Sequence, residues 1–158
     1  MVAQTAVTSF GISVARVSLA SVEARELIAE LDGELRRLYP GVPIRSVDAD
    51  DAQTTFLIAS VAGQPAACGA IRQLEAGVVE IKRMYVRPAF RRRGLARQIL
   101  EALERVARDE GSTSVRLGTG NRQPEALCLY ESAGYQSIPA FGEYVGFPLS
   151  RCFEKRLM

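Results

Sequence analysis

The residues best suited to chemistry form a basic cluster between positions 83 and 97. The cluster holds six arginines and no acidic residue: Arg83, Arg87, Arg91, Arg92, Arg93 and Arg97. Gly94 lies where a strand-like pattern gives way to a helix-like one, and a helix N-terminus offers unpaired N–H groups and a positive dipole end. The cluster therefore predicts a binding site for phosphate, and for a pyrophosphate in particular. An arginine run considered alone is more often only a solvated surface patch.

The sequence contains no histidine, which excludes histidine-based triads, general bases and metal sites. Proton transfer must then use a carboxylate, tyrosine, lysine, cysteine or water. The three cysteines, Cys68, Cys128 and Cys152, form no CxxC pair. Their number and spacing argue against a disulfide framework or a zinc site, so we expect no metal and a reducing compartment. We expect Cys128 to lie in the core, because it is close to Tyr130 on an apolar helix.

The composition is that of an ordinary globular domain of 158 residues. The formal net charge of +2 gives no strong field toward nucleic acid or membrane. No apolar run approaches the roughly 18 residues that would span a bilayer, and the N-terminus lacks the pattern of a signal peptide. We therefore expect a cytoplasmic protein that binds neither nucleic acid nor membrane.

Hydrophobic periodicity predicts three helices among seven strands. The expected helices cover 21–39, 94–110 and 124–133. The expected strands cover 13–19, 54–61, 66–74, 78–86, 114–117, 135–138 and 152–157. Ser21 is the expected N-cap of the first helix, and Glu104 and Arg108 of the second are expected to pair at i,i+4. This order predicts a single α/β (α+β) domain over 13–158, preceded by a loose arm over 1–12.

The segment from Glu80 to Ala96 resembles the central acetyl-CoA motif of the GNAT superfamily of N-acetyltransferases. That motif, [Q/R]-x-x-G-x-[G/A], is matched by Arg91, Gly94 and Ala96. A second hallmark follows in the expected order, with Asn121 after the next strand and then the run Leu129-Tyr130-Glu131-Ser132-Ala133-Gly134-Tyr135. The resemblance covers roughly 54–158, whereas the first 50 residues match only in having a strand followed by a helix.

The resemblance implies a mixed, mostly antiparallel twisted sheet of about six to seven strands flanked by helices. A β-bulge would splay two central strands into a V-shaped slot for acetyl-CoA. The backbone of Met84, Tyr85 and Val86 would pair with the pantetheine arm as if with an added strand. The pyrophosphate would lie on the hinge of the motif, and Asn121 would lie beside the pantetheine. The implied hinge residues are Arg91, Arg92, Arg93, Gly94, Leu95, Ala96 and Arg97.

The resemblance also implies catalytic roles for Tyr130 and Glu80 in direct transfer from the thioester to a primary amine within a ternary complex. Tyr130 would face the thioester sulfur and protonate the departing thiolate as general acid, and its alternative is an ordinary packed tyrosine. Glu80 would be the general base, directly or through water, and its alternative is an exposed residue at a strand end. The acids Asp48, Asp50 and Asp51 are weaker candidates for the base or for holding a cationic substrate.

The acceptor is expected to be a small amine or an amino-acid-like molecule. Arg72, Arg83 and Tyr144 are candidates for lining its side of the site, with either arginine available to hold a substrate carboxylate. Three alternatives stay open: a protein or peptide N-acetyltransferase, a non-catalytic CoA-binding sensor or partner module, and, disfavoured by charge, a nucleic-acid binder. Dimers are common in the resembling family, so a homodimer is compatible with this interpretation.

Overall fold

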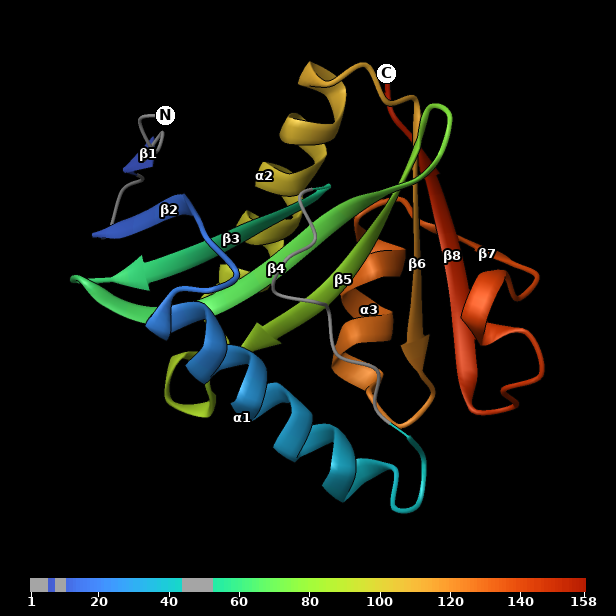
Figure 1. Ribbon diagram of the computed structural model, residues 1–158, viewed down its shortest axis with the longest axis horizontal. Helices are drawn as coiled ribbons and strands as arrows, with labels where there is room; N and C mark the ends of the chain where they lie inside the picture. Colours follow the sequence, from blue (N-terminus) through green and yellow to red (C-terminus); the bar gives the residue numbers. More distant parts are fainter. Residues whose placement is uncertain (1–5, 8–10, 44–52) are drawn as a thin grey trace.

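One continuous sheet of eight strands forms the centre of the computed structural model, which describes residues 6–7, 11–43 and 53–158. The spatial order is β1-β2-β3-β4-β5-β6-β8-β7, and β5 and β6 form the one parallel pair among the described strands (Figure 1). The strands cover Ala6–Val7 (β1), Ile12–Val17 (β2), Thr54–Val61 (β3), Gln64–Glu75 (β4), Val78–Val86 (β5), Ser114–Gly120 (β6), Gln136–Ile138 (β7) and Ser150–Arg156 (β8).

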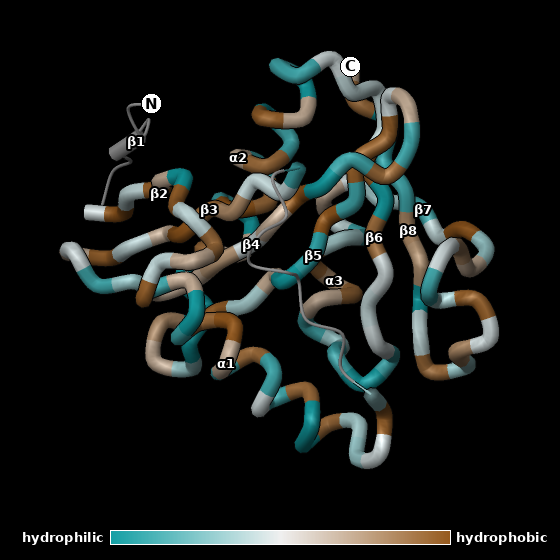
Figure 2. Tube along the Cα trace, in the orientation of Figure 1, coloured by the Kyte–Doolittle hydropathy of each residue, from teal (hydrophilic) through white to brown (hydrophobic). Residues whose placement is uncertain are grey.

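Three α-helices within the described residues flank this sheet. They cover Val22–Leu38 (α1), Leu95–Asp109 (α2) and Pro124–Ser132 (α3), and the 3-10 turns Pro88–Phe90 (η1) and Gly142–Tyr144 (η2) lie in connections. Figure 2 shows hydrophobic and hydrophilic residues alternating along α1 and α2, as expected of helices with one buried side. Within the described ranges, no helix combines the length and the apolar character needed to cross a membrane.

The sheet separates two hydrophobic clusters, because successive side chains of a strand point to opposite faces. Phe56 and Ile58 of β3 pack with Leu27 of α1 on one face. Leu57, between them in the chain, packs with Ile99 of α2 on the other face. The helices α1 and α2 therefore pack against opposite faces of the central strands.

The sequence-based predictions of the elements are largely confirmed. The strands predicted over 54–61 and 78–86 coincide with β3 and β5. The Ser21 hydroxyl accepts a hydrogen bond from the Ala24 N–H at 3.2 Å and caps α1 as expected. Arg108 lies 3.9 Å from Glu104, the predicted i,i+4 pair. The sheet has more than the expected six to seven strands because β1, within the expected loose arm, pairs with β2.

A β-bulge lies at the centre of the sheet, where Gly69 of β4 faces two residues of β5, Arg83 and Met84. Arg83 takes a left-handed φ of 61°, an uncommon conformation for a residue with a side chain. A Cβ on Gly69 would lie 2.6 Å from the side chains of both Ile99 and Met84, so glycine is needed for α2 to pack this closely. A bulge bends its strand and increases the local twist, and this one precedes the end of β5.

The expectation that Cys128 lies in the core is wrong, since this residue is exposed. Residues two apart on a helix point in roughly opposite directions, at about 100° per residue. The face of α3 that buries Tyr130 therefore turns Cys128 to solvent.

Candidate active site

The central cleft opens where β5 and β6 separate. The two strands pair only between Val78–Ile81 and Ser114–Leu117. Beyond that point β5 stays paired with β4 up to Val86, while β6 follows β8 to Gly120, and Figure 1 shows the two strands diverging. The expected V-shaped splay is therefore present, and the cleft that includes it has a volume of about 1260 Å³.

The start of α2 closes one end of this cleft. Gly94 is the N-cap, with a φ of 76°, and no side chain caps the helix. The preceding Arg92 is also left-handed, with a φ of 66°. The first N–H groups of any helix lack intrahelical partners and, with no acidic residue in the first turn of α2, they offer a positive end to an anion.

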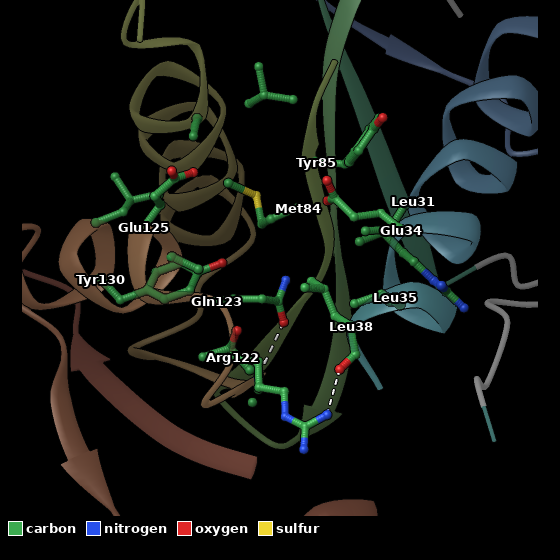
Figure 3. Close-up of a pocket in the computed structure, with 18 of the residues that line it drawn as sticks. Leu31, Glu34, Leu35, Leu38, Met84, Tyr85, Arg122, Gln123, Glu125 and Tyr130 are labelled. Carbon is green, nitrogen blue, oxygen red and sulfur yellow. Dashed lines mark hydrogen bonds between the residues drawn. The ribbon is translucent and has the colours of Figure 1, made fainter. Parts of the chain in front are cut away.

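Most residues expected at the cofactor line the cleft. From β5 and the α2 start these are Met84, Tyr85, Val86, Arg91, Arg92, Gly94, Leu95, Ala96 and Arg97. Figure 3 shows Met84 and Tyr85 extending to opposite sides of β5. Asn121 is exposed, lies outside the lining residues and donates its N–H to the Leu149 carbonyl at 2.8 Å. Arg93 also lies outside the lining, with its guanidinium 5.4 Å from the centre of the Phe90 ring.

The arginines of the hinge differ in their partners. Arg91 donates to the Val86 carbonyl at 2.9 Å and to Glu34 of α1 at 2.7 Å. Arg97 donates to the Ser132 hydroxyl of α3. Arg91 and Arg97 therefore connect the hinge to α1 and α3, while Arg92 is exposed at the edge of the cleft.

Tyr130 is the buried residue of α3 and points into the cleft. Its ring meets Tyr135 edge-on, with centroids 5.8 Å apart, and lies 6.4 Å from the ring of Phe153. Figure 3 shows its hydroxyl directed toward the space beside Met84 and Gln123. Burial raises the pKa of Tyr130 above its ordinary value, so the phenol stays protonated at neutral pH.

Glu80 is buried, not the exposed strand-end residue of the alternative interpretation. Its side chain is 3% exposed, on the sheet face opposite α2. Tyr144 donates to Oε2 at 3.2 Å, Arg72 Nε lies 3.5 Å from Oε1 and Lys82 Nζ lies 3.9 Å from Oε2. Burial raises the pKa of Glu80, and the neighbouring Lys82 and Arg72 oppose that shift. A buried carboxyl whose pKa lies above the ordinary value is suited to accepting a proton.

The candidates for the acceptor side have different surroundings. Arg83 lines the cleft, but its side chain is 6% exposed and its guanidinium donates to Asp32 of α1 at 2.6 Å. Arg72 is partly exposed beside Glu80 and lies outside the cleft lining. Tyr144 lines the cleft and contacts Glu80. The weaker candidates Asp48, Asp50 and Asp51 lie outside the described residues.

The sequence analysis missed a group that joins the two sides of the cleft. Tyr39, at the end of α1, accepts from the Arg122 N–H at 3.0 Å and donates to Gln123 at 3.3 Å. Arg122 in turn donates to the Leu38 carbonyl at 2.8 Å, a bond drawn in Figure 3. A Cβ on Gly120 would lie 1.7 Å from the Tyr39 hydroxyl oxygen, so the glycine makes room for this contact.

Comparison with known proteins gives consistent results. Residues 22–135 match the Acetyltransferase (GNAT) family. The chain is 35% identical over 150 residues to the IAA acetyltransferase of Azospirillum brasilense, covering 92% of this chain and 98% of that protein. A structure from Klebsiella pneumoniae, described as an acyl-CoA N-acyltransferase, superposes with a TM-score of 0.81 at 34% identity and covers 93% of this chain and 98% of that one.

The fold also matches a more distant structure. A GNAT family acetyltransferase of Elizabethkingia anophelis, solved with acetyl-CoA bound, superposes with a TM-score of 0.71 at 17% identity. The match covers 93% of this chain and 99% of that one. Identity this low supports the shared fold and leaves the roles of individual residues to the geometry described above.

Proposed function

The chain belongs to the GNAT family of acetyltransferases, and we propose that it moves the acetyl group of acetyl-CoA directly to the primary amine of a small or amino-acid-like acceptor. The observation that carries this proposal is the meeting of two features in one cleft. The stretch 82–86 of β5 has no strand partner on the side of β6, and the start of α2, which no side chain caps, lines the same cleft. An extended thioester ending in a pyrophosphate has the matching shape and charge.

The donor would bind through backbone groups at both features. Its pantetheine arm would pair with Met84, Tyr85 and Val86 on the edge of β5 that β6 leaves unpaired, because a strand edge binds an extended ligand through main-chain hydrogen bonds. Its pyrophosphate would accept N–H groups at the start of α2 and lie beside Arg92. Gly94, in the αL conformation, and the first residues of α2, Leu95, Ala96 and Arg97, line the cleft.

Tyr130 is proposed as the general acid. In the reaction the neutral amine nitrogen attacks the thioester carbonyl carbon, an amide bond forms as this nitrogen loses its other proton to water, and the carbon–sulfur bond breaks as a thiolate leaves. Tyr130 is protonated at neutral pH and directs its hydroxyl into the cleft, so it can donate to the sulfur as negative charge develops. The sulfur becomes more basic as the carbon–sulfur bond breaks, so the proton is transferred during or after that step.

Glu80 is proposed as the general base, acting through a water. It lies outside the residues that line the cleft, while Lys82 and Tyr144, both in contact with it, line the cleft. A water between these side chains would take the ammonium proton of the acceptor and pass it to the carboxylate. Arg72, beside Glu80, remains available on the acceptor side, and Arg83 would act there only by giving up Asp32.

The proposal is tested by two measurements on the purified protein. Calorimetry measures CoA and acetyl-CoA binding, and a thiol-release assay measures turnover on a panel of monoamines, polyamines, amino acids and lysine peptides. We expect binding of the donor and turnover on small amines or amino acids above the lysine peptides.

Each of the other outcomes would favour a different function or refute the proposal. Turnover on peptides alone would make the chain a protein or peptide N-acetyltransferase. Tight CoA binding with no turnover on any amine would indicate a non-catalytic sensor. Absence of CoA binding would refute the proposal.

A further inference from the structure

Tyr144 lies between the cleft and the buried carboxylate of Glu80. Its hydroxyl donates to Glu80 Oε2 at 3.2 Å, and its side chain lines the cleft. The ring packs on Gly118 of β6, where a Cβ would lie 2.4 Å from the Tyr144 ring. Glycine at this position therefore sets how deeply the phenol can enter, and so whether its hydroxyl reaches Glu80.

An ion pair anchors η2, the turn that carries Tyr144. Lys82 Nζ of β5 lies 2.7 Å from Glu143 Oε1. Glu143 precedes Tyr144 in the chain, and Lys82 lies two residues beyond Glu80 on the same strand. The pair joins η2 to β5, the strand that carries Glu80. The Lys82–Glu143 ion pair and the packing of the Tyr144 ring on Gly118 therefore both hold the Tyr144 hydroxyl near Glu80.

Charged and titratable groups face Glu80 from every neighbouring element. They are Arg72 of β4, Lys82 of β5, Arg116 opposite it in the register of β6, Glu143 and Tyr144 of η2, and Cys152 of β8. The Tyr144 hydroxyl makes the shortest of the three described contacts to the carboxylate, against 3.5 Å for Arg72 and 3.9 Å for Lys82. Like Lys82, it reaches Glu80 from the cleft side, whereas Arg72 lies outside the cleft lining.

We propose that Tyr144 is a positioning residue that orients the Glu80 carboxylate toward the cleft and keeps it ready to receive the acceptor's proton. This role rests on the proposed function, because it requires Glu80 to be the base. It differs from the sequence-based expectation, in which Tyr144 contacts the acceptor. A hydrogen bond donated to a carboxylate favours its charged form, so Tyr144 helps to keep the base deprotonated.

The Tyr144→Phe variant tests this role, because it keeps the ring on Gly118 and removes only the hydroxyl. Loss of a hydrogen bond to a charged group favours the protonated carboxyl. We expect kcat/KM on the acidic side of its pH profile to fall roughly tenfold. The profile should approach that of the wild type at high pH, and the acceptor KM should change less than twofold.

Two further variants complete the experiment. Gly118→Ala should push the Tyr144 ring outward and reproduce the shifted acidic limb. Tyr135→Phe is the matched control, since Tyr135 also donates to a buried carboxylate, Glu104 at 2.9 Å, but outside the cleft lining. It should leave the pH profile unchanged.

The outcomes separate this inference from the proposed function. A rise in acceptor KM at every pH, with no change in the acidic limb, would assign Tyr144 to acceptor binding and overturn the positioning role. Loss of activity in Glu80→Gln together with a wild-type profile for Tyr144→Phe would overturn the positioning role alone. Full activity in Glu80→Gln would refute both the role of Glu80 as the base and the positioning role of Tyr144.

Discussion

Tyr130 combines burial with access to the cleft, and these properties define what its hydroxyl can do. The ring is held by Tyr135 and Phe153, so removal of the hydroxyl should leave the packing intact. We expect Tyr130→Phe to lower kcat about 100-fold, the lower end of the range for general acid catalysis, with a KM for acetyl-CoA within about threefold. Steady-state kinetics at saturating acceptor measures both quantities.

A thermal unfolding curve controls for structural damage in this variant. The midpoint should remain within about 2 °C of the wild type, because the ring contacts are preserved. A variant that turns over as fast as the wild type would remove Tyr130 from the mechanism and leave protonation of the sulfur to water.

Residue types alone located part of the site. The motif spacing pointed to Gly94, and the structure places it at the start of α2 beside the cleft. The sequence could not show that Arg91 bonds Glu34, 57 positions away, because such a pair depends on the packing of α1 against the sheet. It also gave no indication that Tyr144 reaches Glu80 or that Tyr39 reaches Gln123.

At the scale of elements, the two ends of α2 provide a matched test of the anion site. Gly94 before the helix and Gly111 after it have φ values of 76° and 85°, and a Cβ on either would meet open space. Alanine in the left-handed region costs about 1–2 kcal/mol, so Gly94→Ala and Gly111→Ala should be destabilised alike. Only Gly94 lines the cleft, and Gly94→Ala should weaken CoA binding about tenfold through relaxation of the turn.

Calorimetry with CoA distinguishes the two variants, and urea unfolding confirms their similar stability. Equal CoA affinity in Gly94→Ala and Gly111→Ala would show that the turn before α2 does not contribute to donor binding.

A second prediction at this scale concerns the attachment of α2 to the C-terminal strands. Glu104 is 4% exposed and accepts from Tyr135 at 2.9 Å and from Lys155 of β8 at 3.0 Å. Removing one partner of a buried ion pair is strongly destabilising, and partial exposure of Lys155 reduces the cost. We expect Glu104→Gln to lose about 2 kcal/mol of unfolding free energy in urea.

Glu101→Gln is the control for this change, because Glu101 lies on the same helix and is exposed. It should alter stability by less than about 0.5 kcal/mol. Equal losses in the two variants would show that the contacts of Glu104 do not stabilise the fold beyond those of a surface residue.

For the whole molecule, the sequence predicted which elements form, and the packing decided how they meet. Apolar residues recur with a helix period in α1 and α2 and alternate or cluster in the strands, so burial alone locates those elements. The close approaches at Gly69, Gly118 and Gly120 join strands or helices distant in the chain, and periodicity carries no information about them. The prediction for Cys128 was wrong because an apolar sequence on a short helix does not show which face of the helix is buried.

The last residues of β5, 82–86, have no strand partner on the side of β6, so binding of the donor there would change the stability of the sheet. If acetyl-CoA fills that gap, substrate binding completes a backbone ladder that the polypeptide leaves unfinished. Amide hydrogens of 82–86 that β4 does not engage should exchange rapidly in the free protein and slowly with CoA bound, as measured by hydrogen–deuterium exchange. At CoA concentrations about 100 times Kd, unfolding should cost about 2.7 kcal/mol more. The supply of donor would then set the stability of the folded protein as well as its rate of turnover.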